Sequence, residues 1–71
     1  MRNIADAMRA ARLRKGISAA ALGRRAGLSP NTIWAWERGE RIPNLYTIEA
    51  CAEVLGISID EYIGRTVPED D

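Results

Sequence analysis

The sequence has 71 residues, contains no histidine and no phenylalanine, and has one cysteine, Cys51. Without histidine, and with a single thiol, the chain offers neither the usual general base beside a nucleophile nor a ligand set for a transition metal. It has no glycine-rich phosphate loop, and no apolar run approaches the ~20 residues of a membrane-spanning helix. We therefore expect no enzyme, no metal or cofactor and no membrane protein.

The small size of the chain limits its possible functions further. A domain of this length buries only about 60% of its unfolded surface, so a large catalytic pocket is not expected. Cys51 lies in an apolar helical pattern and is expected to be a small buried thiol. The segment from Met1 to Ile4 is not followed by an apolar stretch resembling a secretory signal, which favours a cytoplasmic location.

The net charge of zero hides two halves of opposite sign. Residues 1–43 carry nine basic and three acidic side chains, for a net charge of +6, whereas residues 44–71 carry one basic and seven acidic side chains, for −6. Such a split would orient one end of the molecule toward a polyanion. Ordinary scatter of charges over a solvated surface is the alternative explanation, because there is no polybasic block.

Apolar spacing and capping residues predict five helices. Ser18, Ser29, Asn44 and Ser58 are suitable N-caps, Pro30 suits a first helical position, and Gly16, Gly27 and Gly56 are suitable ends. No period-2 alternation is present, so the fold class is all-α. The predicted helices are 4–15, 19–26, 30–38, 45–55 and 59–64, within one domain of residues 1–64 that is followed by an acidic, flexible tail of residues 65–71.

The tight turn at Gly27 predicts a helix-turn-helix, which makes DNA the leading partner. Around this turn the expected inward residues are Leu22, Ala26, Leu28, Ile33 and Trp36. Rotation by half a turn then leaves an outward face on the second helix, formed by Asn31, Trp34, Ala35 and Arg38.

The chain resembles the phage repressor and Cro type of helix-turn-helix domain over about residues 4–63. The matching segments are Gly16-Ile17-Ser18, Leu22-Gly23, Gly27-Leu28-Ser29, Ile33, Trp36-Glu37-Arg38-Gly39, Arg41 with Pro43, Ala52 to Ser58, and Asp60-Glu61. The resemblance implies a compact five-helix fold of the lambda repressor kind, in which the third helix enters the major groove and the second lies across the DNA backbone.

Carried over by position, the resemblance assigns Pro30, Asn31 and Ala35 to base-facing sites, with Thr32 and Trp34 beside them. Asn31 is the strongest reader, because its amide can pair with the N6 and N7 edge of adenine, although it also suits a role in capping the helix. Trp34 could contact DNA, at a thymine methyl or at the sugar-phosphate backbone. The alternative is that it packs against a partner protein.

Five residues are expected to contact DNA phosphates. Arg24 and Arg25 are weaker candidates for such contacts. Two of the five belong to a helix start, where free backbone N–H groups meet the positive end of the helix dipole. The five are Ser18, Ala19, Ser29, Arg38 and Arg41. The family usually has glutamine at the position of Ala19, so one side-chain contact is missing. The resemblance also implies a structural salt bridge between Arg12 and Glu37.

We interpret the chain as a sequence-specific regulator of transcription, a repressor, that binds double-stranded DNA as a homodimer on a two-fold operator. The expected dimer interface is the apolar end that carries Ile57, Ile59, Tyr62, Ile63 and Val67. An antitoxin-like or anti-regulator protein, whose main partner is another protein, is the alternative. A purely structural helical module is a third possibility, which the basic half makes less attractive.

Overall fold

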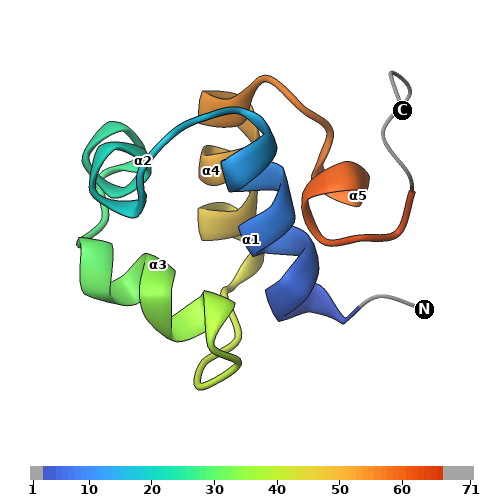
Figure 1. The fold of residues 1–71 in the computed structure, drawn as a ribbon, viewed down its shortest axis with the longest axis horizontal. Coiled ribbons are helices and arrows are strands. Elements are labelled where there is room, and N and C mark those ends of the chain that lie inside the picture. Colours follow the sequence, from blue (N-terminus) through green and yellow to red (C-terminus); the bar gives the residue numbers. More distant parts are fainter. Residues whose placement is uncertain (1–2, 67–71) are drawn as a thin grey trace.

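The computed structural model describes residues 3–66, which form five helices joined by short turns. The helices are α1 (Ile4–Arg14), α2 (Ala19–Ala26), α3 (Pro30–Glu37), α4 (Leu45–Leu55) and α5 (Ile59–Tyr62). Residues 3–66 contain no strand, which confirms the all-α prediction. In Figure 1, α1 and α4 occupy the middle of the molecule, α2 and α3 lie on one side of them, and α5 lies on the other.

Each helix begins at a capping side chain. Asn3, Ser18, Ser29, Asn44 and Ser58 each accept a hydrogen bond from a backbone N–H three residues further on. Such a bond satisfies one of the free N–H groups of the first turn and stabilises a helix by about 1 kcal/mol. The predicted caps are therefore all present, and Asn3 adds a fifth. The helices α1, α3 and α5 end one or two residues earlier than predicted, a difference typical of frayed last turns.

The start of α5 forms only one half of a reciprocal capping box, although Ser58 and Glu61 have the spacing for both halves. The Ser58 hydroxyl accepts a hydrogen bond from the backbone N–H of Glu61 at 3.0 Å. The Glu61 carboxylate does not return to Ser58 but pairs with the guanidinium of Arg14 at the end of α1. The acidic residue therefore connects two helices that are far apart in the sequence.

One apolar core occupies the space between the helices. Its largest fully buried side chains are Tyr62, Met8, Leu22, Ile33 and Cys51. Cys51 is the small buried thiol that the sequence predicts, and burial raises its pKa. Tyr62 contradicts the sequence-based expectation, which placed it at a dimer interface. Its side chain has no exposed surface, because the short α5 folds back against α1 and α4.

The Tyr62 hydroxyl is the one buried side-chain polar atom of the described residues without a hydrogen-bond partner. Burial raises the pKa of Tyr62 far above its ordinary value. The aromatic ring thus contributes to packing while its polar atom is left unsatisfied, an arrangement that costs free energy.

The described residues account for most of the predicted domain of residues 1–64. Of the predicted tail, Arg65 and Thr66 are exposed, and residues 67–71, including Val67 of the expected dimer interface, lie outside the described range. Within residues 3–66, every helix is too short or too polar to cross a bilayer. The same range contains no cluster of three or more side chains suited to hold a metal ion.

Candidate nucleic-acid interface

The turn between α2 and α3 holds the two helices in one fixed arrangement. Gly27 has a φ of +78°, which returns the chain sharply after α2. The Leu28 backbone N–H then donates to the carbonyl of Gly23 at 2.7 Å. A Cβ atom at position 23 would lie 2.7 Å from the Leu28 carbonyl oxygen, so only glycine allows this approach. The geometry is that of a helix-turn-helix.

The first turn of α3 presents the predicted base-facing residues in different states. Asn31 is exposed and takes no part in capping, since Ser29 is the cap. The Thr32 hydroxyl lies 2.9 Å from the Ser29 hydroxyl, so both side chains are engaged in the cap, and Pro30 is half-buried. Trp34, one turn along the helix, is 43% exposed. The amide of Asn31 is thus the free polar group of this turn.

Ala35 does not lie on the outward face as expected. Its side chain is buried. The Ala35 carbonyl accepts hydrogen bonds from the backbone N–H groups of Glu40 at 2.9 Å and Arg41 at 3.4 Å, which close the turn after α3. The side chain of Ala35 is only 9% exposed, so the outward face is narrower than a half-turn rotation suggests, and the methyl contact between Ala35 and thymine stays a prediction.

Arg12 and Glu37 form a two-pronged ion pair between α1 and α3. The Arg12 Nε and Nη2 atoms donate to the two Glu37 carboxylate oxygens at 2.8 and 2.9 Å, and Nη1 donates to the Ile17 carbonyl at 3.0 Å. The side chains are only 11% and 5% exposed. The hydrogen bond to Glu37 is the main cause that raises the pKa of Arg12. The resemblance implied this pair, and its geometry fixes the position of α3 on the domain.

The cations near α3 are not equally free to meet phosphate. Arg38 is exposed but pairs with Glu40, Nε to Oε2 at 2.9 Å. This pairing raises the pKa of Arg38 and lowers that of Glu40. Arg41 is exposed, and it forms no ion pair within residues 3–66.

Arg9 is a candidate that the sequence reasoning missed. Its side chain lines a hollow of about 280 Å³ together with Trp34 and Arg38, among others. Arg9 lies one helical turn before Arg12, which reaches Glu37 on α3. Residues three apart lie on the same face of a helix, so the spacing of Arg9 from Arg12 could have indicated that Arg9 also faces α3.

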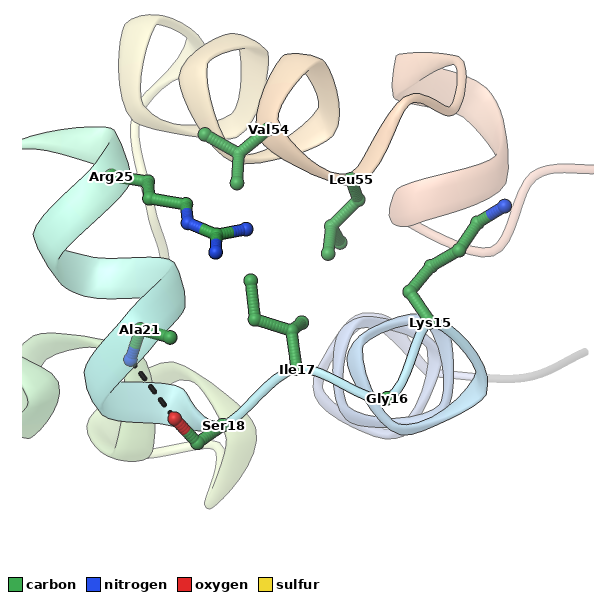
Figure 2. A pocket seen from close by; sticks show the side chains of 8 residues that line it. All are labelled: Lys15, Gly16, Ile17, Ser18, Ala21, Arg25, Val54 and Leu55. Atoms are coloured by element: carbon green, nitrogen blue, oxygen red, sulfur yellow. Dashed lines mark hydrogen bonds between the residues drawn. The ribbon is translucent and has the colours of Figure 1, made fainter.

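The beginning of α2 supplies a further candidate surface, shown in Figure 2. The exposed Ser18 hydroxyl accepts from the Ala21 backbone N–H at 3.0 Å. The Ala19 side chain is buried, so a phosphate contact from this residue would have to come from its backbone N–H. Behind the helix start, the Arg25 guanidinium points into a hollow of about 520 Å³ between Ile17 and Val54.

The expected dimer interface is less apolar at its surface than the sequence suggested. In addition to the buried Tyr62, the residues Ile57, Ile59 and Ile63 are half-buried and pack against the core. The most exposed large apolar side chains of residues 3–66 lie elsewhere, at Leu13, Trp34, Ile42, Leu45 and Tyr46.

Comparison with known proteins gives one family and several structures. Residues 8–62 match the family described as Helix-turn-helix. The P22 c2 repressor in complex with synthetic operator 9T is 33% identical, with a TM-score of 0.80 over 89% of this chain and 96% of that one. The solution structure of the DNA-binding domain of the P22 c2 repressor is 34% identical, also with a TM-score of 0.80, over 86% and 80% of the two chains.

A third solved structure belongs to an enzyme. Hydroxypropylphosphonic acid epoxidase from S. wedmorenis is 33% identical, with a TM-score of 0.76 over 84% of this chain. The match covers 32% of the epoxidase chain, so it concerns a part of that protein. No curated protein sequence matches at a significant level.

Proposed function

The chain belongs to the helix-turn-helix family, in its phage repressor type, and we propose that it regulates transcription by binding operator DNA. The proposal is that α3 lies in the major groove and that occupancy of the operator represses transcription. A related protein that matches 89% of this chain is bound to a synthetic operator, which supports the choice of DNA as partner. The epoxidase match is confined to a third of that enzyme, and we propose no catalytic role.

The observation that carries the proposal is the arrangement around Asn31. Its amide is exposed on the first turn of α3, on a helix whose position is fixed by the Arg12–Glu37 pair. The exposed Arg9 lines a hollow with Trp34 and Arg38, and the exposed Arg41 lines another that includes Arg38, so both cations lie beside the second half of the same helix. In protein–DNA interfaces, amides commonly read bases while cations hold phosphates, and this helix offers both kinds of side chain.

We further propose that the protein acts as a homodimer. One α3 helix with one free reading amide contacts too few bases to specify a site, whereas a two-fold dimer doubles the contacts on a palindromic operator. A regulator of this kind would act in the cytoplasm, where the DNA is accessible. Phosphate contacts in each protomer would come from Arg41, from Arg38 after release from Glu40, and from the helix starts at Ser18 and Ser29.

The test begins with salt dependence and ends with sequence selection. Titration of a labelled nonspecific duplex at several salt concentrations should give a log–log slope of several negative units, because each neutralised phosphate releases counterions. Duplexes selected from a random pool should then share a motif. Asn31→Ala should relax the preference at one base pair by about 1 to 3 kcal/mol, while Arg41→Ala should weaken all sites alike. A pool without a shared motif would exclude sequence-specific regulation by this domain alone.

A protein partner is the second candidate, and the exposure of Trp34 favours it. Tryptophan is enriched at the centres of protein interfaces. In that case the nonspecific duplex should bind almost not at all at any salt concentration. Trp34→Ala would then abolish capture of the protein partner, whereas on the DNA hypothesis it weakens duplex binding.

A further inference from the structure

A hollow between α2 and the end of α4 combines an apolar floor with two cations. Its volume is about 520 Å³, and Ile17, Val54 and Leu55 form its apolar lining. Arg25 points into it from α2, and Lys15 extends from the end of α1 on the opposite side (Figure 2). We call this space the α2–α4 hollow. It offers apolar surface and positive charge at the same place.

The two cations of the α2–α4 hollow take no part in the ion pairs that join the helices. Both side chains are exposed, and neither Lys15 nor Arg25 forms an ion pair within residues 3–66. By contrast, Arg12 and Arg14 of α1 pair with carboxylates of other helices. Salt screens an ion pair beside apolar surface less than a pair in open solvent. The hollow therefore suits a ligand that brings carboxylates.

The chain itself carries such a ligand. After Thr66, where the described residues end, the sequence continues as Val67-Pro68-Glu69-Asp70-Asp71. We call residues 69–71 the acidic segment. We propose that the acidic segment docks at the α2–α4 hollow, with its carboxylates beside Arg25 and Lys15. Each of the two cations then has an acidic partner of opposite charge.

The described chain ends on the side of the domain where Lys15 lies. The backbone N–H groups of residues 65 and 66 donate to the Asp60 carbonyl at 2.8 and 3.4 Å, which holds residue 66 against the first turn of α5. The next residue of α5, Glu61, pairs with Arg14, and Arg14 directly precedes Lys15. The acidic segment therefore begins two residues beyond a point that is close to one edge of the hollow.

The length of residues 67–71 is sufficient for the acidic segment to extend along the hollow. Five extended residues span up to about 17 Å. The domain measures only 22 and 20 Å along its two shorter axes. A residue that precedes a proline favours an extended backbone, so Val67 favours a course away from α5 over a further helical turn. We therefore expect the acidic segment to pass Lys15 and to reach the guanidinium of Arg25.

Docking of the acidic segment regulates the DNA interface, a consequence that rests on the proposed function. Ser18 lines the same hollow, and it is one of the residues proposed to contact phosphate. Carboxylates docked beside Ser18 repel phosphates, so DNA binding requires the acidic segment to leave. The acidic segment then acts as an internal competitor that lowers the affinity for nonspecific DNA.

The NMR signal of the Arg25 Nε–H group tests the docking in the absence of DNA. The variant Glu69→Gln/Asp70→Asn/Asp71→Asn keeps the length of the chain and removes the three charges. We expect the Arg25 signal to shift between the wild type and this variant, while the Arg24 signal stays in place. Arg24 is exposed on the same helix but does not line the hollow. An unchanged Arg25 signal, or equal shifts at both arginines, would overturn the proposal.

Titration of a labelled nonspecific duplex tests the competition. Removal of the three acidic charges should tighten binding by at least about threefold at low salt, because a competitor for the phosphate site is lost. In the Arg25→Gln background this factor should fall to less than about half, since the acidic segment has lost a partner there. The Arg24→Gln background, which removes the same charge one residue away, should keep the full factor. An equal factor in all three backgrounds, or no gain in the wild type, would overturn the competition.

The two measurements separate this inference from the proposed function. If no variant binds the duplex while the Arg25 signal shifts, the proposed function fails and the docking is supported. If the duplex binds with a salt slope of several negative units while the Arg25 signal stays in place, the proposed function is supported and the docking is wrong.

Discussion

Replacement of Glu37 by leucine should destabilise the domain by about 3 to 5 kcal/mol, the usual cost of leaving one partner of a buried ion pair alone. The Arg12 guanidinium would keep its hydrogen bond to the Ile17 carbonyl and lose the two to the Glu37 carboxylate at 2.8 and 2.9 Å. Because its side chain is only 11% exposed, water replaces the carboxylate poorly. At roughly 4 to 8 °C per kcal/mol for a domain of this size, the melting temperature should fall by at least about 12 °C.

Urea unfolding followed by circular dichroism measures the effect and its cause. The double variant Arg12→Met/Glu37→Leu removes both charges and should recover most of the loss, since the apolar pair leaves no unpaired ion. Arg38→Gln, which breaks the exposed pair with Glu40, is the control and should change stability little. A loss below about 1 kcal/mol in Glu37→Leu, or a double variant no more stable than the single one, would refute this reasoning.

Three other variants test separate features. Glu40→Gln releases Arg38 from its carboxylate, so a nonspecific duplex should bind more tightly and with a steeper salt slope; unchanged titrations would show that the pair does not compete with phosphate. Gly23→Ala places a Cβ 2.7 Å from the Leu28 carbonyl oxygen and should cost about 1 to 3 kcal/mol in urea unfolding; an unchanged midpoint would contradict the close approach. Tyr62→Phe removes the unpartnered hydroxyl and should match or exceed wild-type stability at neutral pH. Burial raises the pKa of Tyr62 in the folded state. The contribution of the neutral Tyr62 to the free energy of unfolding is therefore fully present below its unfolded pKa of about 10 and declines above that pH, by up to about 1.4 kcal/mol per pH unit. The loss of unfolding free energy between pH 7 and pH 11 should be smaller in Tyr62→Phe than in the wild type.

The fold was predictable because its signals are local. Four of the helices begin directly after a capping residue whose side chain accepts a hydrogen bond from the backbone N–H three residues further on. These capping residues are Ser18, Ser29, Asn44 and Ser58. Residues close together in the sequence therefore determine where each of these helices begins. The glycine ends are equally local, since a positive φ at Gly27 or Gly56 costs glycine little. The five helices and the all-α class follow from these signals together with the apolar spacing.

The candidate site was predictable only in part, because exposure depends on how distant segments pack. Ala35 was expected half a turn from the inward residues, yet its side chain is only 9% exposed, and no periodicity within α3 reveals this. Tyr62 belongs to a helix of four residues, too short to show which face is inward, and its burial depends on α1 and α4. The roles of Asn31 and the phosphate-binding residues remain predictions for the experiments above.

The short bond between Leu28 and Gly23 has a consequence for the operator. This bond closes the turn that leads into α3, and Arg12 and Glu37 join α3 to α1, so we expect the arrangement of α1, α2 and α3 to change little when DNA binds. A rigid protein surface does not adapt to the DNA, so any difference in shape between the two must be accommodated by bending or twisting of the duplex. We expect the preferred operators to be distinguished also by base steps that no side chain touches, where the double helix deforms at low cost.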